Sequence, residues 1–544
     1  MKTSSPANWA VASMAGLFMS PLLVQASTSN TKLLPAPPMG FNNWARFMCD
    51  LNETLFTDTA DSMRSRGLLA AGYNRLTLDD CWMRMERSAN GSLEWDTDKF
   101  PNGIPWLREE VKSKGFLLGI YEDSGDLTCG GYPGSYQYEK QDAELFASWG
   151  IDYLKMDGCN VEPEEGRSLR EEYDVRYSKW HDILSALPEP LIFSNSAPAY
   201  FQDNASDWAV VMDSCPEYGE LARHSADVQV FETKSSPWNS IMFNYDYHTL
   251  LVRYQQPGYY NDPDFLITDN PYLSKDEKAS QFALWASLGA PLIISAHIPD
   301  LTDDEIKLLS NEALIAVDQD PLAQQAALVS RDGTFDVLSR SLESGDRLLA
   351  VVNRGDNAGK TSVPLARLGL SDSKCEYKAR ELLTGKETTV DSAFDIQLNS
   401  HATAVYRVEL PEDCDKTIPT GMVFHTPSGL CMTASGQSVS YEKCSASDSQ
   451  VWQVAGKDSK VTLSPLSDTS LCLAGKDGQP SLATCEDGAG TTWEHYLTGH
   501  LRNEDAGGCL TKGSGKGIEA CVVDNAAQIF GLASGVRLAD KGLR

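Results

Sequence analysis

The sequence predicts an α/β fold in which a (β/α)₈ TIM barrel is followed by a small antiparallel β domain and a threefold β repeat. The barrel is predicted by three apolar runs, residues 73–82, 116–125 and 151–160, each of which follows a helical stretch and ends in acidic residues. Strands that deliver polar groups at their carboxyl ends are typical of a barrel whose active site lies on that face. The repeat is predicted by three similar cysteine-containing units after residue 420.

Length and charge restrict the classes of function. The chain has 544 residues, too many for one domain, and 42% of them are hydrophobic, which is enough for substantial cores. Lys and Arg number 46 against 76 Asp and Glu, so the net charge is −30. We therefore do not expect nucleic acid or an anionic membrane surface as a partner.

The N-terminus predicts export. Lys2, the apolar segment 11–24 and the small residues ending at Ala26 are typical of a signal peptide over residues 1–26. No later stretch reaches the roughly 20 apolar residues of a membrane span, so we expect a secreted protein. Thirteen cysteines fit an oxidising compartment. Three sequons would be glycosylation sites there: Asn52, Asn90 and Asn204.

The barrel is expected over residues 27–325, where strand-like and helix-like segments alternate. Helices are predicted at 58–66, 104–114, 141–149 and 278–288. Besides the three strands already described, later strands are predicted within 189–196, 258–267 and 290–298. This is about the length of one (β/α)₈ barrel.

The pattern changes over residues 326–413 to short alternating runs with turn residues between them and little helix signal. It predicts a small antiparallel β domain, a sandwich packed on the barrel. Cys375 and Cys414 could form a disulfide within it, although sequence alone does not fix the pairing.

Residues 420–544 contain an internal repeat. Its first cysteines, Cys431, Cys472 and Cys509, are spaced 41 and 37 residues apart. Each is followed by a second cysteine after 12 or 13 residues and, eight or nine residues later, by an aromatic residue: Trp452, Trp493 or Phe530. Units of about 40 residues cannot bury their own apolar face, so the three are predicted to stack into one module.

Acids and aromatic rings carry the candidate chemistry. The eight histidines include no HExxH motif, and no glycine-rich phosphate loop precedes a helix. Asp79 and Asp80 could in principle hold Mg²⁺, but neither a His pair nor a Cys cluster accompanies them, so we expect no metal. Glycoside hydrolysis uses two carboxyl groups, about 5–5.5 Å apart in retaining enzymes and about 6.5–9.5 Å in inverting ones. Asp157, with Lys155 nearby to keep it ionised, is a candidate nucleophile.

Eight segments carry a family resemblance: MGFNNWARFMCD, LTLDDCW, FPNGI, KSKGFLLGIYEDSG, TCGGYPGSY, DAELFASWGIDYLKMDGCN, YYNDPDFL and VDQDPL. They run in order through residues 33–325. On them the chain resembles glycoside hydrolase family 27 of clan D, the α-galactosidases and α-N-acetylgalactosaminidases. The resemblance implies a (β/α)₈ barrel followed by an antiparallel β domain, and a retaining exo-glycosidase that forms a covalent glycosyl-aspartate and needs no metal or organic cofactor.

The same resemblance assigns site residues. Asp157 matches the family's nucleophile in a K-x-D motif, and Asp227 matches the general acid/base in an R-x-x-x-D segment. Asp79 and Asp80 match the pair that binds the galactose 4- and 6-hydroxyls and so selects galactose over glucose. The remaining matches are contacts to the sugar: Trp44, Tyr121, Lys155, Arg223 and Asp264.

One departure concerns the substituent at C2 of the sugar. Galactose-specific animal members carry Glu and Leu after the fifth strand, whereas this chain has Ser196 and Ala199. This small pair resembles the N-acetylgalactosaminidase branch, in which it makes room for the acetamido group. Galactose and N-acetylgalactosamine therefore both stay open as the preferred sugar.

The resemblance also implies two disulfides in the barrel, Cys49–Cys81 and Cys129–Cys159, the second next to the nucleophile loop. Such a bridge would help to hold Asp157 in place. Cys215 is left over and is expected to be free and buried.

The C-terminal repeat resembles a ricin-type β-trefoil, the family 13 carbohydrate-binding module. Sugar-binding repeats of this type usually carry Asp two residues after the first cysteine, but the three positions here are Thr433, Ala474 and Thr511. We therefore expect the trefoil fold over residues 420–544 with a structural or weak binding role. The implied disulfides are Cys431–Cys444, Cys472–Cys485 and Cys509–Cys521.

The leading hypothesis is a secreted enzyme of the fungal type that removes terminal α-linked galactose or N-acetylgalactosamine from oligosaccharides and glycoconjugates. One alternative is a secreted galactose-binding lectin with an inactive barrel, which would bind sugar through the repeat and hydrolyse nothing. A second alternative is a metal-dependent sugar isomerase on the same barrel, which would lose its activity in chelator. The sequence fixes neither the natural linkage nor the oligomeric state.

Overall fold

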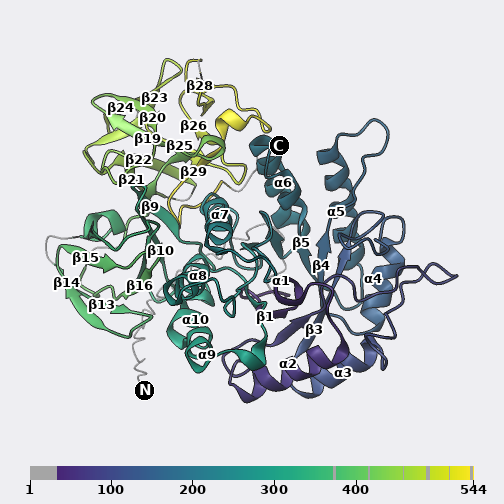
Figure 1. The fold of residues 1–544 in the computed structure, drawn as a ribbon. Coiled ribbons are helices and arrows are strands. Elements are labelled where there is room, and N and C mark those ends of the chain that lie inside the picture. The colour runs from purple at the N-terminus through teal and green to yellow at the C-terminus, as the bar shows by residue number, and fades with distance from the viewer. Residues whose placement is uncertain are drawn as a thin grey trace, which may run out of the picture.

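The computed structural model describes residues 33–539 apart from 372–374, 415–416, 458, 486–489 and 514, together with residue 543. The expected signal peptide, residues 1–26, lies outside the described residues. The predicted fold class is confirmed: a parallel eight-stranded barrel, an antiparallel sandwich and a β-trefoil follow one another along the chain (Figure 1).

Eight short parallel strands form the barrel, in the order β7-β6-β5-β4-β3-β2-β1-β8. A parallel bridge between Leu266, just after β7, and Ile294 in β8 closes the circle. The strands are β1 (Met39–Asn42), β2 (Arg75–Thr77), β3 (Leu117–Asp123), β4 (Tyr153–Asp157), β5 (Ile192–Asn195), β6 (Leu221–Arg223), β7 (Tyr260–Asp262) and β8 (Leu292–Ile294).

Helices surround this barrel, and they include the four that the sequence predicts. The first of these, α2, begins at residue 53 rather than 58, because the Asn52 side chain caps it by accepting from the Leu55 N–H at 2.9 Å. Three long helices between 169 and 248 were not predicted. The barrel helices are α1 (Trp44–Phe47), α2 (Glu53–Ser65), α3 (Ile104–Ser113), α4 (Glu139–Ser148), α5 (Leu169–Ser185), α6 (Ala205–Tyr218), α7 (Trp238–His248), α8 (Lys275–Leu288), α9 (Asp303–Leu309) and α10 (Glu312–Asp318), with a 3₁₀ turn η1 (Ala197–Phe201) after β5.

Strand β4 shows how the barrel aims polar groups at one place. Successive side chains of a strand point to opposite faces. Leu154 and Met156 therefore pack into the hydrophobic core shared with the helices, whereas Lys155 and Asp157 point into a cavity at the carboxyl ends of the strands. The apolar residues anchor the strand in the core, and Lys155 and Asp157 remain available to contact a ligand in the cavity.

The second domain is a sandwich with its own core. Its larger sheet has the order β14-β13-β16-β11-β10-β9, and β12 and β15 form a second sheet. The disulfide whose pairing was left open joins Cys375 to Cys414. The strands are β9 (Ala327–Arg331), β10 (Phe335–Ser341), β11 (Arg347–Asn353), β12 (Gly359–Pro364), β13 (Tyr377–Glu381), β14 (Glu387–Val390), β15 (Ala393–Leu398) and β16 (Thr403–Val408).

The third domain is the repeat, and its aromatic residues occupy the core: Trp452, Trp493 and Phe530 have no exposed surface. The two tryptophans donate from Nε1 to the carbonyl oxygens of Met432 and Leu473. The strands are β17 (Thr420–Met422), β18 (Phe424–His425), β19 (Leu430–Ser435), β20 (Ser438–Glu442), β21 (Val451–Lys457), β22 (Lys460–Pro465), β23 (Leu471–Lys476), β24 (Gln479–Thr484), β25 (Trp493–His495), β26 (Leu501–Asn503), β27 (Gly508–Leu510), β28 (Ile518–Glu519) and β29 (Phe530–Gly531).

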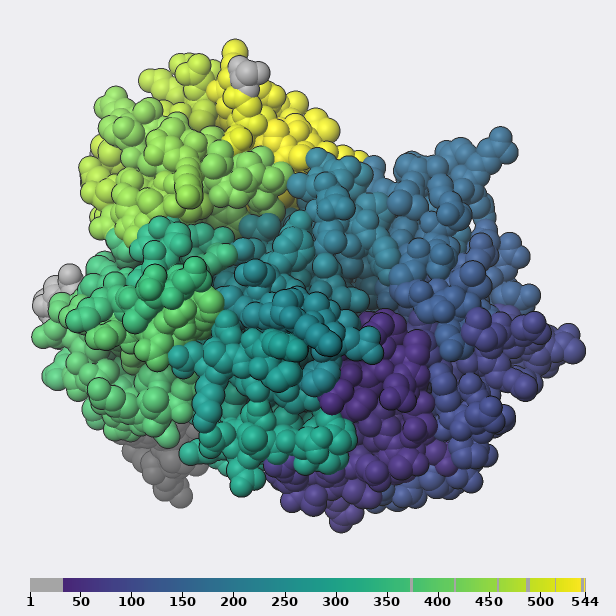
Figure 2. All heavy atoms as spheres, viewed as in Figure 1, coloured from purple at the N-terminus to yellow at the C-terminus, as the bar shows by residue number. Residues whose placement is uncertain are grey.

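The trefoil is packed against the rest of the molecule, and Figure 2 shows it in contact with both the barrel and the sandwich. Met422 and Phe424 belong to the same buried cluster as the barrel residues. Arg253, which is 9% exposed and follows α7, donates from Nε to the Leu497 carbonyl of the trefoil at 2.7 Å. Because this contact shares a hydrophobic core, the trefoil is a fixed part of the molecule.

The remaining sequence predictions can be located as well. All five implied disulfides are formed. Cys215 is a free, buried thiol. The three sequon asparagines, Asn52, Asn90 and Asn204, are exposed. No helix in the described part of the chain combines the length and the apolar character needed to cross a bilayer.

Candidate active site

A cavity of about 250 Å³ opens at the carboxyl ends of the barrel strands. Larger hollows of about 740 Å³ on the sandwich and about 490 Å³ between α5, α6 and the trefoil lack this convergence of strand-end acids. The cavity brings together most of the predicted site residues. Its lining is Trp44, Asp79, Tyr121, Cys129, Lys155, Asp157, Cys159, Ser196, Ala199, Tyr200, Arg223, Ser225, Ala226 and Asp227.

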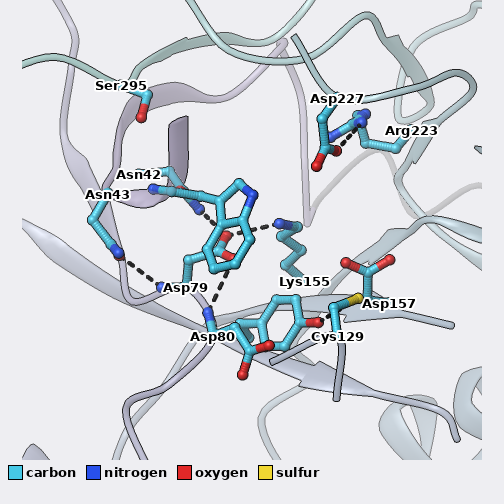
Figure 3. Close-up of polar contacts among 12 residues, drawn as sticks. Asn42, Asn43, Asp79, Asp80, Cys129, Lys155, Asp157, Arg223, Asp227 and Ser295 are labelled. Atoms are coloured by element: carbon cyan, nitrogen blue, oxygen red, sulfur yellow. Dashed lines mark hydrogen bonds and ion pairs between the residues drawn. The ribbon is translucent and has the colours of Figure 1, made fainter. Parts of the chain in front are cut away.

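Lys155 lies at the centre of this cavity. Its Nζ is 2.7 Å from Oδ2 of Asp79, which also accepts from Asn42 Nδ2 at 2.7 Å (Figure 3). The sequence places Lys155 as a partner of Asp157, but its ion pair is with Asp79. Its positive charge nevertheless lies close enough to lower the pKa of Asp157.

Asp157 and Asp227 lie on either side of the Lys155 ammonium group and face the same space (Figure 3). Burial raises the pKa of Asp157, while the charge of Lys155 and a hydrogen bond from the Tyr200 hydroxyl to Oδ1 act in the opposite direction. Ser196 and Tyr200 come from the turn after β5. Burial has the larger effect, so the pKa of Asp157 lies above its usual range.

Tyr200 is a site residue that the sequence analysis did not single out. Its hydroxyl bonds Asp157 and lies 3.2 Å from the sulfur of Cys159. Tyr200 lies in the 3₁₀ turn η1, in which i and i+3 share a face, so spacing links Ser196 with Ala199 but gives no signal for Tyr200.

Asp227 stands at the mouth of the cavity, with its side chain 58% exposed. Arg223 donates to its Oδ1 at 2.8 Å and pairs on its other side with Asp264 at 2.9 Å. Burial raises the pKa of Asp227, but the charges of Arg223 and Lys155 outweigh this effect and hold the pKa below its usual range. The free site therefore favours ionised Asp227.

Two predicted sugar contacts, Asp80 and Asp264, lie just behind the cavity. Asp80 is fully buried and accepts from the backbone N–H groups of Cys81 and Gly130 at 2.6 and 2.7 Å. Asp264 has a left-handed backbone, with φ of 80°, and holds Arg223 and the Val228 N–H. Asp264 therefore holds Arg223, which lines the cavity, and Asp80 holds the loop residue next to Cys129, which also lines it.

The disulfide Cys129–Cys159 forms part of the cavity wall. Tyr121 donates to the sulfur of Cys129 at 3.3 Å, so the bridge connects the tyrosine of β3 to the loop after Asp157. Among the described residues, one group of acidic and cysteine side chains lies close enough together to bind a metal ion: Asp123 with the two sulfurs of this disulfide. Because the sulfurs are joined to each other, they offer no thiolate ligand.

Ser196 and Ala199 leave space at one side of the cavity. The Ser196 hydroxyl is buried and has no hydrogen-bond partner among the described atoms. A buried hydroxyl without a partner is costly, which makes it a ready donor or acceptor for a ligand that enters the cavity.

The trefoil positions that usually bind sugar are occupied by internal contacts. Gln450 donates to the hydroxyl of Thr433, and Gln528 donates to that of Thr511, both at 2.9 Å. The third position is Ala474, which offers no hydrogen bond from its side chain. Internal contacts therefore occupy the usual sugar-binding position in two of the three repeats.

Comparisons with known proteins match all three domains. Family models described as "Alpha galactosidase A", "Alpha galactosidase C-terminal beta sandwich domain" and "Ricin-type beta-trefoil lectin domain" cover residues 36–320, 332–408 and 419–530. The chain is 56% identical to alpha-galactosidase A of Aspergillus niger over 530 residues, 96% of each chain. It is 37% identical to alpha-galactosidase 2 of Arabidopsis thaliana, over 65% of this chain and 84% of that protein.

Solved structures agree with these matches. Alpha-galactosidase I from Mortierella vinacea superposes with a TM-score of 0.63 at 27% identity, over 71% of this chain and 99% of that one. The alpha-galactosidase of Saccharomyces cerevisiae with raffinose superposes with a TM-score of 0.61 at 25% identity, over 71% of this chain and all of that one.

Proposed function

Because the chain belongs to the alpha-galactosidase family, we propose that it is a retaining exo-glycosidase that hydrolyses terminal α-D-galactosyl residues. The observation that carries this proposal is the pair Asp157 and Asp227, which face one cavity from either side of Lys155. A glycosidase needs one carboxylate to attack the sugar and one carboxyl group to serve the leaving oxygen. The lectin alternative loses support, because the barrel has both acids and two trefoil positions are filled from within.

In the first step, an ionised Asp157 attacks the anomeric carbon while the bond to the leaving oxygen breaks. Asp227 reacts in its protonated form, although the free site favours the ionised one, and it gives its proton to that oxygen. A galactosyl ester of Asp157 remains. In the second step, the ionised Asp227 takes a proton from water, the water oxygen attacks the anomeric carbon, and Asp157 leaves as a carboxylate. Two inversions return the α configuration.

Recognition of the sugar is assigned to the opposite side of the cavity. Asp79 and Lys155, joined by an ion pair, offer an acceptor and a donor to hydroxyl groups, with Asp80 behind them. Trp44 and Tyr121 offer apolar ring surface to the sugar. An equatorial hydroxyl in place of the axial 4-hydroxyl would leave these buried charges unpaired, which selects galactose over glucose.

The direct test is hydrolysis of nitrophenyl α-galactoside, followed by nuclear magnetic resonance of the sugar released. We expect α-galactose as the first product, because a double displacement retains configuration. Release of β-galactose first would contradict the covalent mechanism, and absence of turnover with specific galactose binding would restore the lectin hypothesis.

Tyr200 offers a second test of the nucleophile assignment. Tyr200→Phe removes the hydrogen bond that stabilises the ionised form of Asp157, so the pKa of Asp157 rises and the acid limb of kcat/KM moves to higher pH. We expect kcat to fall roughly tenfold, the usual cost of one hydrogen bond to a charged group. The measurement is the pH profile of kcat/KM on nitrophenyl α-galactoside.

A matched control exists for this change. Tyr136 donates to the Glu164 carboxylate at 2.8 Å at an exposed position outside the cavity. Tyr136→Phe removes the same kind of bond and should leave both rate and pH profile unchanged. An acid limb that stays in place in Tyr200→Phe would contradict the proposed bond to the nucleophile.

We further propose that the site accepts α-N-acetylgalactosaminides. The support is the small pair Ser196 and Ala199, with a buried Ser196 hydroxyl that is free to bond an acetamido group. Oligosaccharides and glycoconjugates that end in either sugar are the expected substrates. The ratio of kcat/KM on nitrophenyl α-galactoside and its 2-acetamido analogue decides between them.

Ala199→Leu is expected to separate the two sugars. The larger side chain fills the space assigned to the acetamido group, so kcat/KM on the 2-acetamido substrate should fall roughly tenfold or more, while that on the galactoside changes roughly twofold at most. Ala197→Leu would alter packing behind the wall and is unsuitable, because Ala197 is buried. Ala226→Leu, on another side of the cavity, is the better comparison. An equal loss on both substrates would place the acetamido group elsewhere.

We infer export from the cell as well. The N-terminal segment resembles a signal peptide, and the six disulfides together with three exposed sequon asparagines suit an oxidising compartment.

A further inference from the structure

Asp123 is a buried acid beside the catalytic cavity, and the proposed mechanism does not use it. It is the last residue of β3, it has no exposed surface, and it stands opposite Asp157 in the parallel register of β3 and β4. It does not line the cavity. A carboxylate is costly to bury, so its contacts should explain why it is there.

Both oxygens of Asp123 hold loop backbone. Oδ1 accepts from the Gly125 N–H at 2.7 Å, and Oδ2 accepts from the Cys159 N–H at 2.8 Å. Cys159 is two residues beyond the nucleophile. Asp123 therefore connects the loop that follows β3 to the loop that follows β4, on the side of Asp157 that the substrate does not touch.

Other bonds show that the two loops are fastened to each other at the nucleophile. The Ser124 N–H donates to the Asp157 carbonyl at 2.8 Å, and the Asp126 N–H donates to the Asn160 carbonyl at 3.3 Å. The disulfide Cys129–Cys159 closes the same junction on the cavity side. Without Asp123, the Cys159 N–H would lose its acceptor, and the loop would be held at that residue by the disulfide.

We propose that Asp123 is a positioning residue for the reaction: it fixes the Asp157 loop through the Cys159 N–H. This proposal rests on the assignment of Asp157 as nucleophile. The covalent step needs its attacking oxygen within a few tenths of an ångström of its productive place, and a displacement of about 1 Å can cost roughly 10²-fold in rate.

Two buried acids lie side by side at this junction. Burial and the charge of Asp157 both raise the pKa of Asp123, while the hydrogen bonds from the Cys159 and Gly125 N–H groups act in the opposite direction. Asp157 also experiences Lys155, Asp227 and Arg223 across the cavity. The groups that face Asp123 are Asp157, Asp80, Glu122 and the tyrosines at 121, 173, 177 and 200.

The test compares wild type with Asp123→Asn, which keeps the shape but presents an NH₂ group to one of the two N–H donors. We expect kcat to fall roughly 10- to 100-fold, and KM to change less than roughly threefold, because Asp123 does not line the cavity. A loss confined to kcat separates displacement of the nucleophile from damage to the sugar-binding side of the cavity.

A mechanism-based fluorinated galactosyl fluoride reads the nucleophile directly, because it traps the ester and its labelling rate follows the ionisation of Asp157. Glu122→Gln is the matched control. Glu122 is a buried acid on the same strand, and its carboxylate accepts from Ser135 at 3.1 Å and from the Asp123 N–H at 3.0 Å. A glutamine can still accept from the Asp123 N–H and donate to the Ser135 hydroxyl, so we expect kcat to stay within roughly twofold of wild type. Thermal denaturation of both variants measures the loss of stability that a structural role alone would cause.

Asp123→Glu keeps the charge but displaces it, and it replaces Asp123→Asn as the test variant if Asp123→Asn does not fold. We expect its kcat to fall, because the longer side chain displaces the acceptor of the Cys159 N–H. The proposal is overturned if Asp123→Asn or Asp123→Glu keeps kcat within roughly twofold of wild type, or if Asp123→Asn lowers activity only in proportion to the folded fraction. If wild type itself is not labelled at Asp157, the proposed function fails instead.

Discussion

Asp157→Asn is expected to lower kcat by roughly 10⁴-fold or more, the scale of loss when a covalent enzyme is deprived of its nucleophile. An amide has almost the same shape as the carboxylate but cannot form the galactosyl ester. Tyr200 and Gly158 still have a carbonyl oxygen to bond in the variant. The fold and the binding of sugar should therefore persist. The measurement is kcat on the nitrophenyl α-galactoside and on its 2-acetamido analogue, with galactose binding measured by calorimetry.

Asp126→Asn is the control for this loss. Asp126 is an exposed acid in the loop after β3, close in sequence to the junction that holds Asp157. The same chemical change there should leave kcat within roughly twofold of wild type, because surface substitutions are usually mild. Substantial residual activity of Asp157→Asn on both substrates would show that another residue is the nucleophile.

Sequence predicts those site residues whose orientation follows from the local alternation of apolar and polar residues. In β4, alternation alone puts Lys155 and Asp157 on one face and Leu154 and Met156 on the other, and the structure has this arrangement. The pairing of Lys155 with Asp79 is different, because it joins strands 76 residues apart in sequence. Periodicity cannot specify which of several nearby acids a flexible lysine side chain reaches.

The same limit explains the helices and site residues that were missed. Helix α6 contains Pro216 near its end, and α7 is rich in aromatic and polar residues of low helix propensity, so neither pattern stands out. They form because their apolar faces pack on the barrel, as Trp208 and Tyr245 do. The position of Tyr200 is set by the path of the turn after β5, and that path depends on the same packing.

The trefoil is attached to the barrel through buried contacts. Its apolar residues Met422 and Phe424 are part of the barrel's buried cluster, and Arg253 of the barrel is fixed to the Leu497 carbonyl. Internal contacts fill the usual sugar-binding position in two of the three repeats, and all three repeats lack the expected aspartate. We therefore expect the trefoil to contribute to the stability of the molecule more than to sugar binding.

Asp227→Ala is expected to have an effect that depends on the leaving group. Loss of a general acid usually costs roughly 10²- to 10⁴-fold, so kcat/KM on an α-galactosyl oligosaccharide should fall by that amount. A leaving group that departs without a proton, such as fluoride or dinitrophenolate, should still leave quickly and form the ester with Asp157. The measurement is kcat/KM across leaving groups of different pKa.

The second step distinguishes the acid/base from a residue that only holds Arg223. In Asp227→Ala no base activates water, so the galactosyl ester should accumulate, and added azide should restore turnover and give α-galactosyl azide. Asp264→Ala also removes an acid from Arg223 but leaves Asp227 in place, so azide should not rescue it. Equal loss on all leaving groups without azide rescue would assign the proton transfer to another group.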